Sequence, residues 1–446
     1  MSTTISPITH EPDALDDAQL AERVLAGHRT YLFPAEARLY EEPLVLVRGR
    51  GVWLEDAKGD TYLDLFSGIL TNSLGQAHPD VLQRVTEQLH TLGHTSTMYL
   101  SENEVAMAER LARIAPGRLK RTFFTNSGTE AIETAIMLAQ VYTGRSEIFA
   151  LRHSYSGRST LATNLTAHSS WRPLPSSMAV KHVLSPYPYR CPFKQPCDDS
   201  CVESFARDLE EAILTTTNGQ PAAFLAETIQ GVGGYIVPPA GYFQRVAEII
   251  HKYGGLLIID EVQAGFGRTG GKWFGIEHWG VEPDIMVMAK GIANGFPVGA
   301  TITRDEIALS WKSKTLSTYG GNPICMAAAI ATHDVMVYED VPTRAQQRGA
   351  QLRAGLDALQ QQHSWIGEVR GMGLMQALEI VEDPVSKTPS PARARKLLEA
   401  AKAERVLIGI GGLNGHIIRV GPSLLITEEE IADGLDRLDR ACKRNP

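Results

Sequence analysis

The segment Ile285-Met286-Val287-Met288-Ala289-Lys290-Gly291-Ile292-Ala293-Asn294-Gly295 sets a lysine between an apolar run and a glycine-rich turn. The four apolar residues are too few for a helix and predict a buried strand. Open α/β sheets bind ligands at the carboxyl ends of their strands, so Lys290 is expected at such an edge. Burial disfavours the ammonium form, and the free amine can attack an aldehyde. A surface lysine in a loop is the alternative, and the neighbouring motifs decide between the two.

Short apolar runs alternate with helical stretches over a large part of the chain. The runs are 122–124, 148–150, 223–225, 256–259 and 285–288. Such alternation is typical of an α/β fold with a mainly parallel sheet covered by helices. We therefore expect a large ligand-binding domain over residues 81–335.

Two further segments flank this region. Residues 45–65 predict two strands, 52–54 and 61–63, around a turn, while residues 343–362 predict a helix and 375–380 a strand. The 446 residues exceed the size of one ordinary core. We expect an N-terminal arm and hairpin segment, 1–80, to pack with a smaller α+β domain over 336–446.

Composition restricts the class of partner. The net charge is -8 and the basic residues are dispersed, so neither nucleic acid nor an anionic membrane is expected as a partner. No apolar run approaches the roughly 20 residues that cross a bilayer. Residues 1–17 are polar and acidic, without a signal or transit pattern, and predict a frayed arm on a cytoplasmic protein.

Three of the five cysteines, Cys191, Cys197 and Cys201, cluster in one polar loop. Their spacing matches no common zinc pattern, and no fourth ligand is evident. We expect thiols in a long loop and no metal site.

The turn at 125–131, Thr-Asn-Ser-Gly-Thr-Glu-Ala, follows the apolar run 122–124 and begins a helix. A helix N-terminus offers free N–H groups and a positive dipole end, so this turn suits a phosphate. The hydroxyls of Ser127 and Thr129 add donors, and Gly128 lets the backbone come close. Ser127-x-x-Glu130 also fits a capping box, which needs no ligand. These residues alone leave both interpretations open.

Asp260 ends the apolar run 256–259, where an unpaired charge is costly. A protonated pyridine nitrogen is one suitable partner, because an Asp opposite it keeps the ring an electron sink. A salt bridge to Arg268 is the alternative.

The segment 265–270 fits the pattern Gly-x-Gly-x-x-Gly that binds dinucleotides after a strand. The residues that follow, 271–275, do not predict a helix start. The carboxylates of Asp260 and Glu261 would also repel a pyrophosphate. A nicotinamide dehydrogenase is therefore disfavoured.

Taken in order, the motifs 127–131, 226–231, 260–263, Lys290 and 318–323 resemble those of class III pyridoxal-phosphate aminotransferases. The resemblance runs from residue 43 to residue 443. Asp-Glu-Val-Gln-x-Gly-Phe-Gly-Arg-Thr-Gly followed by Ala-Lys-Gly is highly specific to that family. It implies pyridoxal-phosphate fold type I, pyridoxal 5'-phosphate as cofactor, and a homodimer or a dimer of dimers.

The resemblance assigns several residues to the cofactor. Lys290 would bind it covalently, and Asp260 would pair with the ring nitrogen. Gln263 would contact the ring hydroxyl, and Tyr155 would stack on the ring face. The phosphate would be held by Ser127, Gly128 and Thr129 of one subunit and by Thr318 of the other.

The resemblance also suggests how substrates are bound. Glu227 and Arg419 match a pair in which the arginine receives a substrate carboxylate and the glutamate masks it when the substrate has none. The segments 66–69, 94–97 and 227–233 are most similar to the alanine-glyoxylate type, which also accepts β-amino acids. Ile69 is expected to bind substrate, whereas His94 is expected to be a buried structural histidine.

The implied activity is transfer of an amino group from an amino acid or ω-amine to a 2-oxo acid, pyruvate or glyoxylate, by a ping-pong mechanism. A lyase acting on a phosphorylated amine and a dialkylglycine-type decarboxylase would keep the same cofactor residues. Ser156, Thr228 and Ser423 stand where the family usually has His, Pro and Pro. These departures remove no catalytic group, but they leave the donor open.

Overall fold

The computed structural model describes residues 17–193 and 199–444. Residues 1–16 of the predicted arm, and Cys197, lie outside the described residues.

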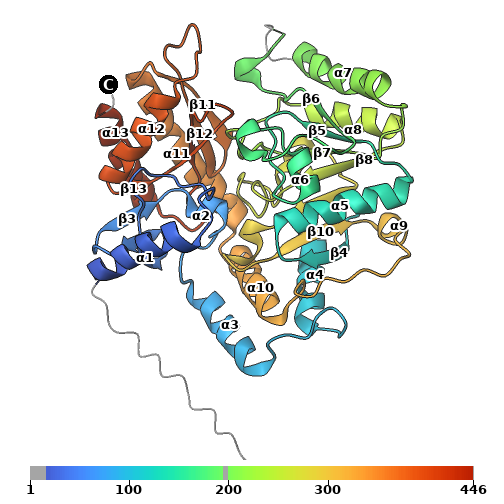
Figure 1. The fold of residues 1–446 in the computed structure, drawn as a ribbon, viewed down its shortest axis with the longest axis horizontal. Coiled ribbons are helices and arrows are strands. Elements are labelled where there is room, and N and C mark those ends of the chain that lie inside the picture. The colour runs from blue at the N-terminus through green and yellow to red at the C-terminus, as the bar shows by residue number, and fades with distance from the viewer. Residues whose placement is uncertain (1–16, 194–198, 445–446) are drawn as a thin grey trace, which may run out of the picture.

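A seven-stranded sheet forms the centre of the larger part of the molecule (Figure 1). The strand order is β4-β10-β9-β8-β7-β5-β6. Neighbours from β9 to β6 are parallel, and β10 runs antiparallel between β9 and β4, so the predicted mainly parallel sheet is confirmed. Its strands are β4 (Arg121–Thr125), β5 (Ile148–Leu151), β6 (Val180–Val183), β7 (Ala223–Glu227), β8 (Leu256–Asp260), β9 (Ile285–Met288) and β10 (Gly299–Thr303).

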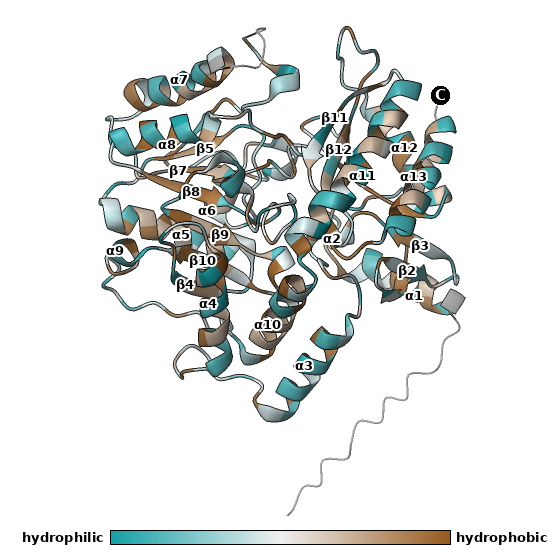
Figure 2. Ribbon diagram, turned by 180° about the vertical axis from the view of Figure 1, so that it is seen from behind, coloured by the Kyte–Doolittle hydropathy of each residue, from teal (hydrophilic) through white to brown (hydrophobic). Residues whose placement is uncertain are grey.

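Helices cover both faces of this sheet. Figure 2 shows hydrophobic strands β7 and β8 inside and hydrophilic surfaces on the outer helices α3, α7 and α8. No helix in the described part of the chain is long and apolar enough to span a membrane. The α-helices here are α3 (Pro79–Thr91), α4 (Glu102–Ile114), α5 (Gly128–Thr143), α6 (Thr160–Leu165), α7 (Asp199–Thr216), α8 (Tyr242–Lys252), α9 (Asp305–Ala308) and α10 (Pro323–Tyr338). The short 3-10 helices are η1 (Ser169–Trp171), η2 (Pro188–Arg190), η3 (Gly275–Trp279) and η4 (Lys290–Ala293).

The C-terminal part contains a second, antiparallel sheet in the order β11-β12-β15-β14. The predicted helix over 343–362 is present as α11, and the predicted strand over 375–380 as β12. The elements are α11 (Val341–Gln362), β11 (Ile366–Met372), β12 (Met375–Ile380), α12 (Pro391–Ala403), β14 (Gly409–Gly411), β15 (Ile417–Val420) and α13 (Glu428–Lys443).

The N-terminal segment lies beside these C-terminal elements (Figure 1). It comprises α1 (Asp17–Tyr31), β1 (Leu46–Arg50), β2 (Trp53–Asp56), β3 (Thr61–Asp64) and the short α2 (Ser67–Leu70). The predicted hairpin is confirmed as β2 and β3, and β1 extends it. Strand β3 pairs in parallel with β13 (Val406–Leu407), which joins the two ends of the chain in one sheet.

Two glycines of the segment 265–270, Gly267 and Gly270, pack closely against α11. Gly267 and Gly270 have φ angles of 81° and 75°. A Cβ at Gly267 would come within 2.7 Å of Val341 Cγ1, and one at Gly270 within 2.8 Å of Gln346 Cα. The next helix is the short η3, which begins at Gly275. A long helix N-terminus that would bind a pyrophosphate does not follow the motif, as the sequence indicated.

Candidate active site

Lys290 follows β9 and begins η4, at the carboxyl edge of the sheet. Its φ of 47° is left-handed, a strained backbone conformation that clusters at functional sites. Burial lowers the pKa of Lys290 to about 8, and the nearby Asp260 charge opposes that shift. Within the described chain, no hydrogen bond or ion pair holds its ammonium group. Lys290 is therefore an accessible amine with an unusually large neutral fraction.

Asp260 ends the neighbouring strand β8 and is buried. Its Oδ1 accepts the Val262 N–H at 2.9 Å. Burial raises the pKa of Asp260, while the Val262 hydrogen bond and the Lys290 charge lower it. The alternative salt bridge to Arg268 is wrong, because that guanidinium donates to the carbonyls of Leu374 and Pro422.

Glu261, the residue after Asp260, has a structural role. Its carboxylate accepts the Thr228 hydroxyl at 2.6 Å and the N–H groups of Gly275 and Ile276 at 3.0 and 2.8 Å. Of the two adjacent acids, only Asp260 faces the cavity beside Lys290.

One cavity of about 320 Å³ brings most of the predicted cofactor residues together. It is lined by Ser127, Gly128, Thr129, Tyr155, Glu227, Asp260, Gln263 and Lys290. The sequence analysis missed other lining residues, namely Thr71, Asn126, Arg158 and Phe296. Arg158 follows Gly157, which packs closely on Thr129. This packing brings Arg158 to the cavity, and the sequence alone does not show it.

The N-terminus of α5 forms one wall of this cavity. The Ser127 hydroxyl caps the helix by accepting the Glu130 N–H at 3.2 Å, as the capping interpretation of this turn expects. The Glu130 carboxylate instead accepts from Asn126, so the full reciprocal box is absent. The N–H groups of a helix's first turn have no partner within the helix, and those of Gly128 and Thr129 can hold an anion.

Pyridoxal phosphate fits this cavity. Gln263 Oε1 is buried without a hydrogen-bond partner among the described residues, and a ring hydroxyl would satisfy it. Asp260 is a buried carboxylate, and no cation among the described residues is hydrogen-bonded to it; a ring nitrogen would supply one. The α5 N-terminus suits the phosphate, and Lys290 suits the aldehyde.

Glu227 and Arg419 are hydrogen-bonded to the two backbone groups of the same residue, Gly231. Glu227 Oε2 accepts the Gly231 N–H at 2.8 Å, and Arg419 Nη1 donates to the Gly231 carbonyl at 3.4 Å. Both side chains are buried, and no direct ion pair joins them. Burial raises the pKa of Glu227, and the Asp260 charge raises it further. Glu227 lines the cofactor cavity, whereas Arg419 lines a larger cleft of about 1200 Å³.

This outer cleft also contains Ile69, the remaining predicted substrate residue. Residues 67–70 all have left-handed φ angles between 49° and 66°, and this turn leaves Ile69 44% exposed. Trp171 lines the same cleft and meets the Tyr155 ring edge-on at 5.6 Å between centroids. Tyr155 therefore lines the cofactor cavity and contacts, through Trp171, a side chain of the outer cleft.

Thr318 and His94 lie outside the cavity of their own chain. Thr318 is exposed. His94 was expected to be buried, and that expectation is wrong: it is exposed, stacks on Tyr319 at 4.9 Å and contacts Asn322 at 3.1 Å. A lone histidine in a polar segment carries no burial signal that a sequence could reveal.

The thiols of Cys191 and Cys201 lie 3.8 Å apart. Among residues 17–193 and 199–444, no group of three or more His, Cys, Asp or Glu side chains could hold a metal ion.

A mainly parallel sheet with a lysine and an aspartate at adjacent strand ends, facing an anion-binding helix N-terminus, defines a pyridoxal-phosphate enzyme of fold type I. The chain matches the family model "Aminotransferase class-III" over residues 35–442, and it belongs to that family. It is a pyridoxal-phosphate-dependent transaminase.

Two of the named relatives carry transaminase names, and a third is a phospholyase, the kind of activity that the sequence left as an alternative. "Alanine--glyoxylate aminotransferase 2 homolog 2, mitochondrial" of Arabidopsis thaliana is 40% identical, over 95% of this chain and 88% of the relative. An (S)-enantioselective omega-transaminase from Thermomicrobium roseum is 34% identical with a TM-score of 0.88, over 95% and 98% of the two chains. A phospholyase from Arthrobacter in complex with phosphoethanolamine is 32% identical with a TM-score of 0.88, over 95% and 100%.

The rate at which the apoenzyme takes up pyridoxal phosphate is expected to rise with pH and to level off above about 8. Only the neutral amine attacks the aldehyde, and Lys290 has a pKa of about 8. Below that value the rate should fall about tenfold per pH unit, as the neutral fraction does. Absorbance after rapid mixing measures the rate. A rise that continues to the ordinary lysine value of 10.5 would contradict the lowered pKa.

Proposed function

We propose that this transaminase moves an amino group from an amino acid or ω-amine donor to pyruvate or glyoxylate. The printed names of its relatives, an alanine–glyoxylate aminotransferase and an omega-transaminase, support both parts of the proposal. The proposal rests mainly on the placement of Glu227 and Arg419. Both are hydrogen-bonded to Gly231, but Glu227 lines the cofactor cavity and Arg419 lines the outer cleft.

In this proposal each side chain has a separate task. The bound cofactor supplies the electron sink for the electrons of the substrate Cα–H bond. Lys290 would take the proton from the substrate Cα and later return it, acting as base and then as acid. With the cofactor bound, Asp260 would keep the ring nitrogen protonated and Tyr155 would hold the ring face. Gln263 would orient the ring through its Oε1, which has no hydrogen-bond partner among the described residues.

Arg419 is suited to receive a carboxylate. Its guanidinium is buried, lies 4.9 Å from the Phe66 ring centroid, and leaves Nε without a hydrogen-bond partner in the described chain. A desolvated cation with a free donor binds a carboxylate strongly. When a substrate has no carboxylate, Glu227 can compensate the same cation after a short movement. One pocket can then serve both an α-amino acid and a simple amine.

Replacing Arg419 by glutamine is expected to raise KM for L-alanine and β-alanine about 10- to 100-fold. A hydrogen bond to a charged group contributes about 1.5–3 kcal/mol, which corresponds to this range. KM for a simple arylalkylamine is expected to change little, since that donor has no carboxylate. Steady-state rates with each donor and pyruvate give the comparison. Equal losses for all donors would contradict the assignment of Arg419.

A half-reaction assay separates the proposed activity from its alternatives. The holoenzyme is mixed with L-alanine, β-alanine, 4-aminobutyrate, an arylalkylamine, phosphoethanolamine or a dialkylglycine, without any 2-oxo acid. With one of the first four donors, a transaminase converts the absorbance of its cofactor to the amine form once per site and releases neither ammonia nor carbon dioxide. A lyase would release ammonia from phosphoethanolamine, the ligand of the related phospholyase, and a decarboxylase would release carbon dioxide from the dialkylglycine.

We also propose that the active unit is a homodimer. Thr318 lies outside its own cavity, as a residue that serves the partner's phosphate would. Apolar side chains near it in the chain or beside His94 are strongly exposed, a sign of a protein interface. They are Met98, Tyr99, Leu100, Leu316 and Tyr319. Sedimentation should give twice the chain mass of 48.7 kDa, and Thr318→Ala should weaken cofactor retention. A monomer with full activity would contradict the proposal.

A further inference from the structure

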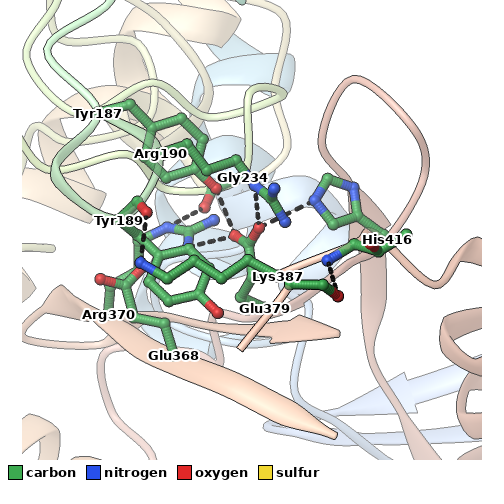
Figure 3. A network of polar contacts seen from close by, with 11 residues as sticks. Tyr187, Tyr189, Arg190, Gly234, Glu368, Arg370, Glu379, Lys387 and His416 are labelled. Carbon is green, nitrogen blue, oxygen red and sulfur yellow. Dashed lines mark hydrogen bonds and ion pairs between the residues drawn. The ribbon is translucent and has the colours of Figure 1, made fainter. Parts of the chain in front are cut away.

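A buried cluster of charged groups lies away from the cofactor cavity, where the C-terminal sheet meets the loop around η2 (Figure 3). Glu379 stands at its centre. Its Oε1 accepts from Arg190 Nε at 2.6 Å and lies 3.0 Å from His416 Nε2. Its Oε2 accepts from Arg370 Nη1 at 2.6 Å and from the Tyr187 hydroxyl. We name these five residues the Glu379 cluster.

Burying the Glu379 cluster costs free energy, because its charged groups lose their contact with water. The Glu379 side chain is 0% exposed and that of Arg370 is 8% exposed. Removing such charges from water costs several kcal/mol per ion, and their attraction repays it only with excellent geometry. Burial of this kind therefore contributes a fixed orientation more than stability.

The register of the C-terminal sheet relates the cluster to the substrate arginine. Arg370 on β11 pairs with Ala377 on β12, and Ala377 pairs with Arg419 on β15. Directly paired residues in a sheet share a face, so these three side chains form one row. Glu379 lies two residues beyond Ala377, on the same face. One face of one sheet thus carries both the cluster and Arg419.

Both arginines of this row hold the same segment of the large domain, residues 231–234. Arg419 donates to the Gly231 carbonyl at 3.4 Å, and Arg370 Nε donates to the Gly234 carbonyl at 2.8 Å. Between them, the Val232 carbonyl accepts the Gly412 N–H at 2.8 Å. The fit is close, since a Cβ at Gly234 would come within 2.7 Å of Ile417 Cγ1.

The same segment positions the other half of the substrate pair. Gly231 N–H donates to Glu227 at the edge of the cofactor cavity. A shift of the segment at Gly234 would therefore change both contacts of Gly231 together. Arg370 and Glu379 touch neither space directly, because neither lines the cavity or the cleft.

We propose that Arg370 and Glu379 are positioning residues that hold residues 231–234 in place and so set the selectivity between substrates with and without a carboxylate. Glu379 fixes the Arg370 guanidinium, Arg370 fixes Gly234, and the segment fixes the relation of Glu227 to Arg419. The inference rests on the proposed function of that pair.

Arg370→Lys is the most direct test, because it keeps the positive charge but loses the fork that reaches Gly234 and Glu379 together. KM for β-alanine and L-alanine should rise about tenfold, while kcat and the rate with an arylalkylamine stay within about twofold. A merely structural role would lower the rate with every donor alike. Uniform loss, or no change for any donor, overturns the proposal.

Glu379→Gln provides a second variant that leaves Arg370 itself in place, and it should shift selectivity in the same direction. Folding is checked by the melting temperature of each holoenzyme. If Glu379→Gln does not fold, Arg370→Lys decides alone. Glu368→Gln is the matched control, since Glu368 also binds Arg370 Nη1, at 2.7 Å, yet contacts no other member of the cluster. A shift with Glu368→Gln as large as with Arg370→Lys overturns the proposal.

Arg419→Gln separates failure of this inference from failure of the proposed function. If Arg419→Gln discriminates against carboxylate donors and Arg370→Lys does not, the positioning role is wrong while the substrate role of Arg419 stands. If Arg419→Gln does not discriminate, the proposed substrate pair is wrong and the positioning role falls with it.

Discussion

Lys290→Ala is expected to lower turnover at least about 10²- to 10⁴-fold, the range typical of losing a general base. Lys290 is the only amine on the wall of the cofactor cavity in the described chain, and its pKa of about 8 suits both removal and return of a proton near neutral pH. The half-reaction with L-alanine, followed by the absorbance of the bound cofactor, measures the loss without interference from the second substrate.

Lys396→Ala is the matched control, because Lys396 is exposed on α12, far from β9. Its rate should equal that of the unchanged enzyme. Adding a small primary amine to Lys290→Ala should restore part of the rate, because the missing group is a base rather than a structural contact. Near-normal turnover in Lys290→Ala would remove the basis of the catalytic assignment.

The strands of the large sheet differed in how well the sequence predicted them. Central strands such as β8 and β9 are buried on both faces, so they are wholly apolar runs that stand out. The edge strand β6 has the sequence Val-Lys-His-Val, and its first three residues are only partly buried. Strand β10 is Gly-Ala-Thr-Ile-Thr, buried yet short in large apolar side chains. Neither strand was predicted, because neither carries the pattern that burial usually produces.

The residues of the active site also differed in how well the sequence predicted them. Lys290 and Asp260 stand at the ends of strands that the sequence reveals, so their proximity follows from the order of parallel strands. Gly231 gave no such signal, although a Cβ there would come within 2.1 Å of Gln263 Nε2. Its hydrogen bond with Arg419 depends on how the C-terminal sheet packs on the loop after β7. Contacts between distant segments of this kind are set by tertiary packing, which local pattern does not report.

The alternative partner of Asp260, Arg268, is excluded for a similar reason. Arg268 is eight residues from Asp260 in the chain, and this closeness in sequence made it the alternative partner. The guanidinium instead reaches carbonyls of the C-terminal part, at Leu374 and Pro422. Burial lowers the pKa of Arg268, and no carboxylate forms an ion pair with it within the described chain. This arginine ties the two parts of the molecule together and leaves Asp260 open toward the cavity.

Asp260→Asn is expected to slow the same half-reaction about 10²- to 10³-fold, comparable to the loss of one preorganised electrostatic contact in other enzymes. Asparagine keeps an oxygen that can accept the Val262 N–H at the same place, so the local fold should persist. What disappears is the negative charge that keeps a ring nitrogen protonated. The cofactor should still be retained, because Lys290 and the α5 N-terminus are unchanged. Rapid mixing with L-alanine measures the rate.

Glu261→Gln is the control for Asp260→Asn because it changes the neighbouring carboxylate in the same manner. Glu261 is fully buried, but its bonds go to Thr228, Gly275 and Ile276 and not into the cavity. Both carboxylate oxygens of Glu261 accept hydrogen bonds, and the amide of Gln has only one oxygen, so this substitution should affect stability more than catalysis. If the two variants slow the half-reaction equally, the effect is one of folding. If only Asp260→Asn does, the charge facing the ring nitrogen drives the chemistry.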